Sequence, residues 1–268
     1  MTDALPVPRV LGHRGSSETA AEHTLAAYRA ALDAGADGLE CDVRLTRDAV
    51  PVCIHDRRVD RTSDGAGVVS TLGLAELAAL DFAPEGTAAT EEVDRDGSGV
   101  LTLERLLDVV AEHGAPVELA IETKHPNRYG RSVEERVVDL LRRRGLDRPS
   151  AGDGTRVRLM SFSPLALTRA KRLAPELPTV HLVSRATARL AAPGLPLAAD
   201  DVGPSIGVLR RDPGYVRRMH LRGRQVLVWT VNTAEDVDLC VRTGVDAIIT
   251  DRPRAVREVL DARRDDAG

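Results

Sequence analysis

Short apolar runs alternate along the chain with stretches in which apolar residues return at intervals of three and four. The short runs, rich in Val, Ile and Leu, are typical of buried strands, and the longer spacing indicates amphipathic helices. The predicted strands cover residues 9–12, 38–43, 50–54, 117–122, 157–161, 179–183, 226–231 and 245–250, with a weaker candidate at 196–199. The predicted helices cover residues 25–35, 72–80, 101–112, 133–144, 165–173, 213–222, 234–242 and 253–263.

This order of elements predicts an α/β fold. Apolar strands that are each followed by a helix favour a parallel sheet with both faces covered. Counting gives eight strands if the run at 50–54 is a hairpin partner of the strand before it. Eight such units in 268 residues predict a TIM (β/α)8 barrel. A doubly wound sheet is the alternative, and the absence of a G-x-G-x-x-G pattern after the first strand disfavours it.

Residues 56–114 interrupt the alternation. They hold a loop with two glycines, two helical patches and a polar stretch, with too few apolar residues for a separate core. We therefore expect one barrel domain over residues 1–268, with a small insertion at about 56–114 after the second strand.

Composition limits the classes of function. The net charge of −4 and the pI of about 6.0 exclude a general binder of nucleic acid or of membrane surfaces. Three widely spaced cysteines without a C-x-x-C pair fit a reducing compartment. Residues 1–8 lack the pattern of a secretory signal, and no apolar run is long enough to cross a bilayer. We expect a cytoplasmic protein without stable membrane insertion.

Glu40 and Asp42 stand two residues apart in a predicted strand. Their side chains would share one face, where two like charges are costly unless a cation lies between them. Taken alone, such a pair is more often a solvated strand edge. Glu122, at the end of the next barrel strand, adds a third carboxylate. An all-oxygen ligand set suits Mg²⁺, Ca²⁺ or Mn²⁺ rather than Zn²⁺, so the three residues predict a site for one divalent cation.

Basic and titratable residues follow the same strands. In a TIM barrel the carboxyl ends of the strands form one rim, so these side chains should converge. Arg14 and Lys124 near a metal predict a phosphate site. His13 and His55 each end an apolar run, and neither is needed as a ligand, which suits a general acid and a general base. The combination fits phosphoester cleavage, and it leaves open which histidine is the base.

The strand predicted at 226–231 brings two further candidates. Trp229 can be a core residue or can line the pocket, and its place near a strand end beside Asn232 favours the pocket.

Several short motifs occur in order from about residue 13 to residue 253. They are His13-Arg14-Gly15, Glu22-x-Thr24, Gly35-Ala36-Asp37, Glu40-x-Asp42, Thr46-x-Asp48, His55-Asp56, Arg61-Thr62, Glu122-x-Lys124, Trp229-Thr230-Val231-Asn232 and Gly244-Val245-Asp246, followed by Thr250-Asp251. Together they resemble the motifs of the glycerophosphodiester phosphodiesterases. The resemblance implies a TIM barrel that cleaves glycerophosphodiesters to sn-glycerol 3-phosphate and an alcohol such as choline or ethanolamine.

The resemblance also implies roles for individual residues. It implies a divalent metal on Glu40, Asp42 and Glu122, acid–base catalysis by His13 and His55, and phosphate binding by Arg14 and Lys124. Further candidates for substrate binding are Glu22, Trp229 and Asn232. One position departs from the family pattern, because His23 stands where the family usually has Asn. Because of this change, the geometry of Glu22 and the substrate range can differ from those of the family, whereas the predicted metal site is unaffected. An exposed residue at a helix start is an equally good interpretation of His23.

Two rival functions follow from the same residues. The first is a lysophospholipase D-like or sphingolipid phosphodiesterase, which needs an apolar patch beside the rim. The second belongs to another class, a barrel that binds phosphorylated ligands without catalysis, and the presence of both histidines speaks against it. The sequence leaves open the head group, the preferred cation, the oligomeric state, and whether a cyclic phosphate or direct attack by water is used.

Overall fold

The computed structural model describes residues 7–82, 99–126, 132–149, 154–184 and 198–267. The strands are β1 Arg9–His13, β2 Gly38–Leu45, β3 Pro51–Cys53, β4 Glu118–Thr123, β5 Arg156–Ser161, β6 Thr179–Val183, β7 Asp201–Pro204, β8 Leu227–Val228 and β9 Ala247–Thr250. The helices are α1 Leu25–Asp33, η1 Val69–Thr71, α2 Leu74–Ala78, α4 Leu103–Glu112, α5 Ser132–Arg143, α6 Pro164–Leu173, α7 Ile206–Arg211, α8 Tyr215–His220, α9 Ala234–Thr243 and α10 Pro253–Ala267.

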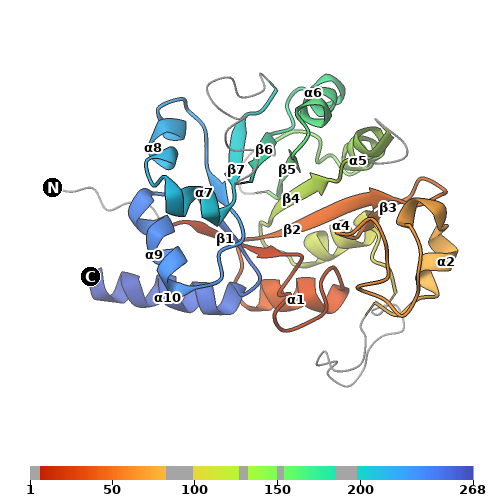
Figure 1. Ribbon diagram of the computed structural model, residues 1–268, viewed down its shortest axis with the longest axis horizontal. Coiled ribbons are helices and arrows are strands. Elements are labelled where there is room, and N and C mark those ends of the chain that lie inside the picture. The colour runs from red at the N-terminus through yellow and green to blue at the C-terminus, as the bar shows by residue number, and fades with distance from the viewer. Residues whose placement is uncertain (1–6, 83–98, 127–131, 150–153, 185–197, 268) are drawn as a thin grey trace.

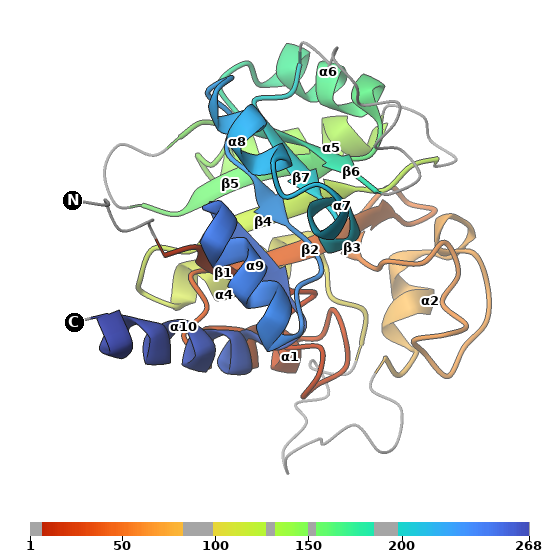
Figure 2. The same cartoon turned by 60° about the vertical axis from the view of Figure 1, so that its left-hand side comes forward.

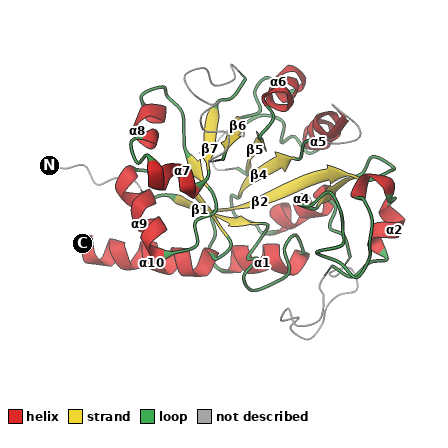
Figure 3. Cartoon of the chain, in the orientation of Figure 1, coloured by secondary structure: helices red, strands yellow, loops and turns green. Residues whose placement is uncertain are grey.

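Eight parallel strands form a nearly closed barrel, with helices around its outside (Figures 1 and 3). The strands neighbour one another in the order β7-β6-β5-β4-β2-β1-β9-β8. Isolated bridges join the two ends of this order, one from Val202 to Val226 and one from Ser205 to Trp229. The predicted TIM barrel is confirmed.

Apolar side chains fill the middle of the barrel and the layer between the strands and the helices. The small interior cluster consists of Leu11, Ala120, Met160, Val180, Leu182, Leu227, Ala247 and Ile249. Neighbouring strand residues such as Val10 and Leu159 belong to clusters that include helix residues, because side chains alternate between the two faces of a strand. Figure 2 shows α9 and α10 packed side by side on one flank of the barrel.

Local signals in the sequence explain where the helices begin and end. The side chains of Thr24 and Ser163 accept hydrogen bonds from the first turns of α1 and α6, which satisfies amide groups that have no partner in the helix. Pro164 occupies the first turn of α6, where its missing amide hydrogen costs nothing. Gly244 ends α9 in the left-handed conformation, with φ of 77°.

The region after β2 is organised differently from the prediction in one respect. β3 pairs antiparallel with β2, as the hairpin interpretation predicted. The segment that follows has a small cluster of its own, made of Val52, Ile54, Val59, Val69, Leu77 and Phe82, and α2 lies beyond β3, away from the helix ring (Figure 1). α4, in contrast, packs into the large cluster under the helix layer. α4 therefore lies in the helix layer, and residues 83–98 of the predicted insertion at 56–114 lie outside the described residues.

The weak strand predicted at 196–199 is not found at Ala198 and Ala199, and its first two residues lie outside the described residues. The next strand, β7, begins at Asp201. β7 has the sequence Asp-Val-Gly-Pro and therefore shows no run of apolar residues. Its first side chain, Asp201, is buried because it pairs with the guanidinium of Arg158 on β5. The helix predicted at 213–222 is present as α8, and a further short helix, α7, precedes it. No helix among the described residues is long and apolar enough to cross a membrane.

Candidate active site

The carboxylates of Glu40, Asp42 and Glu122 meet where β1 and β4 end, beside the middle of the longer strand β2. Strands β2 and β4 are parallel neighbours, and their register places Asp42 opposite Glu122. All three side chains are buried, and one carboxylate oxygen from each lies within 4.8 Å of the others. The predicted cluster is therefore present as a compact set of oxygen donors.

This cluster is electrostatically crowded. Burial, and then the charges of its neighbours, raise the pKa of Glu40 well above its usual range, and the same causes raise the pKa of Glu122 to about 7. Asp42 behaves in the opposite way. Although burial opposes ionisation, the hydrogen bond from His23 and the charge of Lys124 hold the pKa of Asp42 well below its usual range. A divalent cation would fit this set, because it would compensate the repulsion and find only oxygen ligands.

Arg14 and Lys124 bring positive charge to the same cluster. The Nζ of Lys124 lies 2.8 Å from Asp42 and 3.0 Å from Glu122, and the Nε of Arg14 lies 3.1 Å from Asp42. Arg14 stands in a tight turn with φ of 57°, and its amide nitrogen donates to the carboxylate of Glu40. Gly15 follows with φ of 88°, and a Cβ there would lie 2.5 Å from the backbone of α1. The turn that presents Arg14 thus requires glycine.

His13, at the end of β1, is held by a carboxylate from the far end of the chain. Its Nδ1 lies 2.6 Å from Asp251, which follows β9. Because the carboxylate only accepts, Nδ1 carries the proton and Nε2 is left facing Glu40 at 4.0 Å. Asp251 also accepts hydrogen bonds from Ser17 and Asn232. Although burial opposes it, these contacts, above all the one from His13, lower the pKa of Asp251 to about 2.

His55 has the same arrangement on the opposite side. Its Nδ1 lies 2.7 Å from the carboxylate of Asp56, which also accepts from Arg61. Arg44 fixes the backbone by donating to the carbonyl of His55. Partial burial lowers the pKa of His55, and the hydrogen bonds from Arg61 and His55 lower the pKa of Asp56 to about 2 despite its own partial burial. Each histidine is therefore a dyad with a carboxylate, with Nε2 left available.

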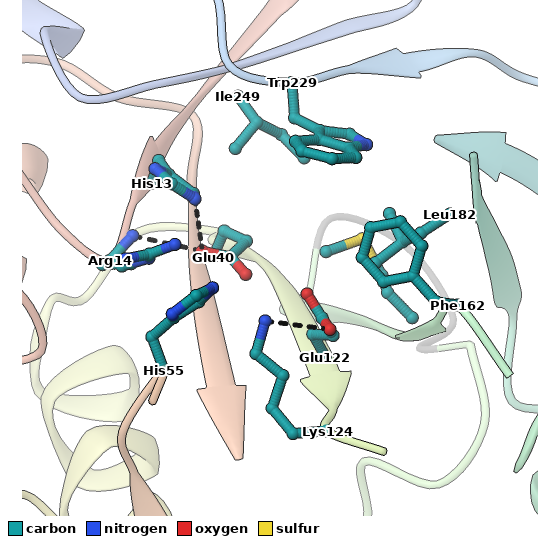
Figure 4. A pocket seen from close by; sticks show the side chains of 11 residues that line it. His13, Arg14, Glu40, His55, Glu122, Lys124, Phe162, Leu182, Trp229 and Ile249 are labelled. Carbon is teal, nitrogen blue, oxygen red and sulfur yellow. Dashed lines mark hydrogen bonds and ion pairs between the residues drawn. The ribbon is translucent and has the colours of Figure 1, made fainter. Parts of the chain in front are cut away.

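A cavity of about 140 Å³ connects these groups (Figure 4). Its polar wall is formed by His13, Arg14, Glu40, His55, Glu122 and Lys124, and its apolar wall by Met160, Phe162, Leu182, Trp229 and Ile249. Trp229 and Phe162 meet edge to face, with ring centroids 5.5 Å apart. The indole nitrogen of Trp229 donates to the carbonyl of Gly203, which fixes the ring at the rim. The cavity can thus hold a small molecule that is anionic on one side and carbon-rich on the other.

Comparisons with known proteins agree on one family. Residues 13–255 match the family model described as the glycerophosphoryl diester phosphodiesterase family. The chain belongs to this family. A probable glycerophosphodiester phosphodiesterase 1 from Mycobacterium tuberculosis is 43% identical over 96% of this chain and 94% of its own length. A glycerophosphodiester phosphodiesterase from Caldanaerobacter subterraneus is 30% identical over 92% of this chain and 95% of its own length.

Solved structures support the same family. An Oleispira antarctica phosphodiesterase in complex with the product sn-glycerol 3-phosphate is 27% identical, has a TM-score of 0.77, and covers 95% of this chain and 97% of its own. A Silicibacter pomeroyi structure described as a putative glycerophosphoryl diester phosphodiesterase is 28% identical, has a TM-score of 0.81, and covers 96% of this chain and 94% of its own. The predicted family, fold and phosphoric diester hydrolase class are thereby confirmed. Glycerophosphodiester phosphodiesterases generally depend on a divalent metal, and the carboxylate cluster is a fitting place for one.

The structure brings most of the sequence-predicted site residues of this phosphodiesterase together. Seven of them line the cavity, namely His13, Arg14, Glu40, His55, Glu122, Lys124 and Trp229. Asp42 is buried behind Lys124. Glu22 and Asn232 do not line this cavity. Glu22 pairs with Arg14, which lines the cavity, and with Arg61. Asn232 donates to Asp251, which in turn contacts His13 of the cavity wall.

Three residues have a place in the site that sequence reasoning did not assign to them. Asp251 and Asp56 orient the two histidines, and His23 is buried against Asp42. Asp56 follows His55 directly, and an acidic neighbour of a histidine in a strand-end loop was the available signal. Asp251 lies 238 residues from His13, and only its position after the last strand could have suggested the contact.

Proposed function

We propose that this chain hydrolyses glycerophosphodiesters, such as glycerophosphocholine or glycerophosphoethanolamine, to sn-glycerol 3-phosphate and an alcohol. The observation that carries the proposal is the single cavity in which two histidine–carboxylate dyads face a cluster of three carboxylates. The Oleispira antarctica phosphodiesterase, which has a similar fold, has sn-glycerol 3-phosphate bound as its product. That complex supports the same substrate class for this chain.

In this proposal Glu40, Asp42 and Glu122 hold one divalent cation, Mg²⁺ or Ca²⁺, with Mn²⁺ as a third candidate. When bound, such a cation supplies Lewis-acid polarisation of a phosphoryl oxygen. Arg14 and Lys124 line the cavity beside the cluster and are placed to offset the charge that develops on the other phosphoryl oxygens.

His13 and His55 are the proposed acid–base pair. One Nε2 accepts the proton of the nucleophile, which is either the neighbouring hydroxyl of the glycerol or a water molecule. The other Nε2 donates a proton to the oxygen of the departing alcohol as its bond to phosphorus breaks. Asp251 and Asp56 keep each Nδ1 protonated and stabilise the imidazolium form during the transfer.

The remaining predicted residues contribute binding or support. Trp229 offers a flat apolar wall for the carbon atoms of the substrate. The Oε1 of Glu22 lies 3.2 Å from Nη1 of Arg14, and the Nδ2 of Asn232 donates to Oδ2 of Asp251 at 2.5 Å. We also propose a cytoplasmic location, because the three cysteines are buried and unpaired, which suits a reducing compartment.

An assay of product release tests the proposal. The purified protein is incubated with glycerophosphocholine, with and without excess EDTA, and sn-glycerol 3-phosphate is measured enzymatically. We expect release that stops with the chelator and returns with Mg²⁺ or Ca²⁺. Phosphorus NMR during the reaction shows a cyclic phosphate if the glycerol hydroxyl is the nucleophile, and none if water attacks directly.

A lysophospholipid is the essential second substrate in this assay. Phe162 and Leu165, beside the rim, expose 37% and 69% of their surface, and this apolar feature favours the rival lysophospholipase D activity. Faster release of alcohol from the lysolipid than from glycerophosphocholine would support that rival. Turnover that continues in excess chelator would contradict the metal site, and no turnover of either substrate would favour a non-catalytic binding barrel.

A further inference from the structure

His23 is a buried link between the carboxylate cluster and helix α1. Only 6% of its surface is exposed, and both ring nitrogens have partners. Its Nε2 lies 3.0 Å from Oδ2 of Asp42, and its Nδ1 lies 2.8 Å from the hydroxyl of Tyr28. The interpretation of His23 as an exposed residue at a helix start is therefore wrong. The imidazole lies directly behind a proposed ligand of the cation.

The backbone at His23 shows that the loop is shaped to place this ring. His23 has φ of 62°, a left-handed conformation that non-glycine residues adopt uncommonly. Its amide nitrogen donates to the carbonyl of Arg14 at 3.0 Å, which ties the loop to the turn that carries the phosphate-binding arginine. A strained conformation persists only where surrounding contacts hold it, and the two ring hydrogen bonds are such contacts.

The partners of the ring assign its proton. The carboxylate of Asp42 only accepts, so Nε2 of His23 donates to it, and Nδ1 accepts from the hydroxyl of Tyr28. Tyr28 is itself completely buried on α1, and its hydroxyl also lies 3.3 Å from the backbone carbonyl of Glu40. Tyr28 therefore holds the ring of His23, and both side chains contact strand β2, His23 at Asp42 and Tyr28 at Glu40.

Asp42 is the carboxylate that this chain of contacts orients. Its Oδ2 faces His23 and Arg14, and its Oδ1 faces Lys124 at 2.8 Å. Arg14 and Lys124 both line the cavity. The ring of His23 hydrogen-bonds to Asp42 and Tyr28, and neither of these residues lines the cavity. Partners of this kind fix the orientation of a ligand and raise its affinity for the metal.

We propose that His23 is the positioning residue of the cation site, that it fixes the rotation of the Asp42 carboxylate, and that Tyr28 anchors it. The inference rests on the proposed metal site at Glu40, Asp42 and Glu122. It predicts that the affinity for the cation depends on a hydrogen-bond donor at the place of Nε2. The role is separate from the proton transfers, which belong to His13 and His55.

Two substitutions of matched length isolate this donor. In His23→Gln the side-chain amide can reach the position of Nε2, whereas His23→Met has similar length and no donor. The dissociation constant for Mg²⁺ or Ca²⁺ is measured by calorimetry on chelator-treated protein, without substrate. We expect His23→Gln to stay within about threefold of the unsubstituted protein and His23→Met to bind about 10- to 100-fold more weakly. Saturating cation should restore most of the turnover of His23→Met.

Tyr28→Phe provides a milder second test that leaves the loop residue unchanged. It removes only the hydroxyl, so Nδ1 loses its partner, and we expect cation binding about three- to tenfold weaker. Equal affinities for the Met, Gln and unsubstituted proteins would overturn the inference and leave the metal site intact. Equal weakening in Gln and Met would also overturn it, because the donor would then be irrelevant. Absence of binding to the unsubstituted protein would remove the metal site itself, and the inference with it.

Discussion

The interior of the barrel carries charged side chains at both of its ends, and the two ends treat them differently. At the amino ends of the strands, the guanidinium of Arg158 donates to Glu118 at 2.8 Å and also pairs with Asp201. Arg9 pairs with the same Glu118, so two cations face two carboxylates. Arg158 and the two carboxylates are buried, Arg9 is partly exposed, and within this group each carboxylate has a guanidinium partner.

The carboxyl ends of the strands are not balanced in this way. Among the described residues, Arg14 and Lys124 are the Arg and Lys side chains that pair with these three buried carboxylates, and burial together with the repulsion between the carboxylates raises the pKa values of Glu40 and Glu122. Burying such a cluster costs stability unless a further positive charge is bound. The comparison teaches that the buried ions at the amino ends are paired with one another, whereas the unmatched end is the proposed place of binding and catalysis.

The largest expected effect lies in the histidine dyads of the catalytic end. His13→Ala or His55→Ala should lower kcat by about 10²- to 10⁴-fold, because each removes a proposed general acid or base, and the free energy of unfolding should not change. His220→Ala is the matched control. His220 also pairs with a carboxylate, Asp246, at 2.8 Å, but it lies outside the cavity, and its substitution should leave kcat within about twofold. Near-full activity in either dyad variant would contradict the assigned roles.

The next effect belongs to the balanced end. Arg158→Met leaves Glu118 and Asp201 buried without their main partner, and we expect a loss of about 3–5 kcal/mol in the free energy of unfolding. Urea denaturation measures it, and KM for glycerophosphocholine should not change. Arg263→Met removes a surface pair with Asp238 and should cost less than about 1 kcal/mol. Similar losses in both variants would show that the buried network has no special weight.

The smallest effect is a gain of stability at the catalytic end. Glu122 has a folded pKa of about 7, above the usual 4.5, so its charge opposes folding as pH rises between these values. In excess EDTA, Glu122→Gln should therefore be about 2 kcal/mol more stable than the unsubstituted protein at pH 8, and nearly equal to it at pH 5. Urea denaturation at the two pH values decides the matter. A variant that is less stable at pH 8 would contradict the idea of an unbalanced cluster.

Much of the fold follows from local patterns in the sequence. Apolar runs such as Thr179–Val183 predict strands because both faces of a barrel strand are covered. The carboxylates of β2 were placed on one face by their spacing alone, and the parallel register then brought Asp42 opposite Glu122. The hairpin of β2 and β3 was predicted because treating residues 50–54 as the partner of the preceding strand leaves eight strands for the barrel.

What the sequence did not predict depends on contacts between distant residues. The strand β7 begins with Asp201, and this carboxylate can be buried because it pairs with Arg158, which is 43 residues away in the sequence. The burial of His23 depends on a positive φ and on a hydroxyl from α1, and neither is visible in a pattern of apolar positions. The support that Asp251 gives to His13 likewise requires the barrel to close, because β1 and β9 must first become neighbours.

Calorimetric titration of the chelator-treated protein with Mg²⁺ or Ca²⁺ tests the central claim most directly. The account predicts that the unsubstituted protein and Arg158→Met each bind one cation per chain, because Arg158 lies at the other end of the barrel. It predicts that Glu122→Gln no longer binds the cation, because this substitution removes one of the three carboxylate ligands. Undiminished binding by Glu122→Gln, or no binding by the unsubstituted protein, would contradict it.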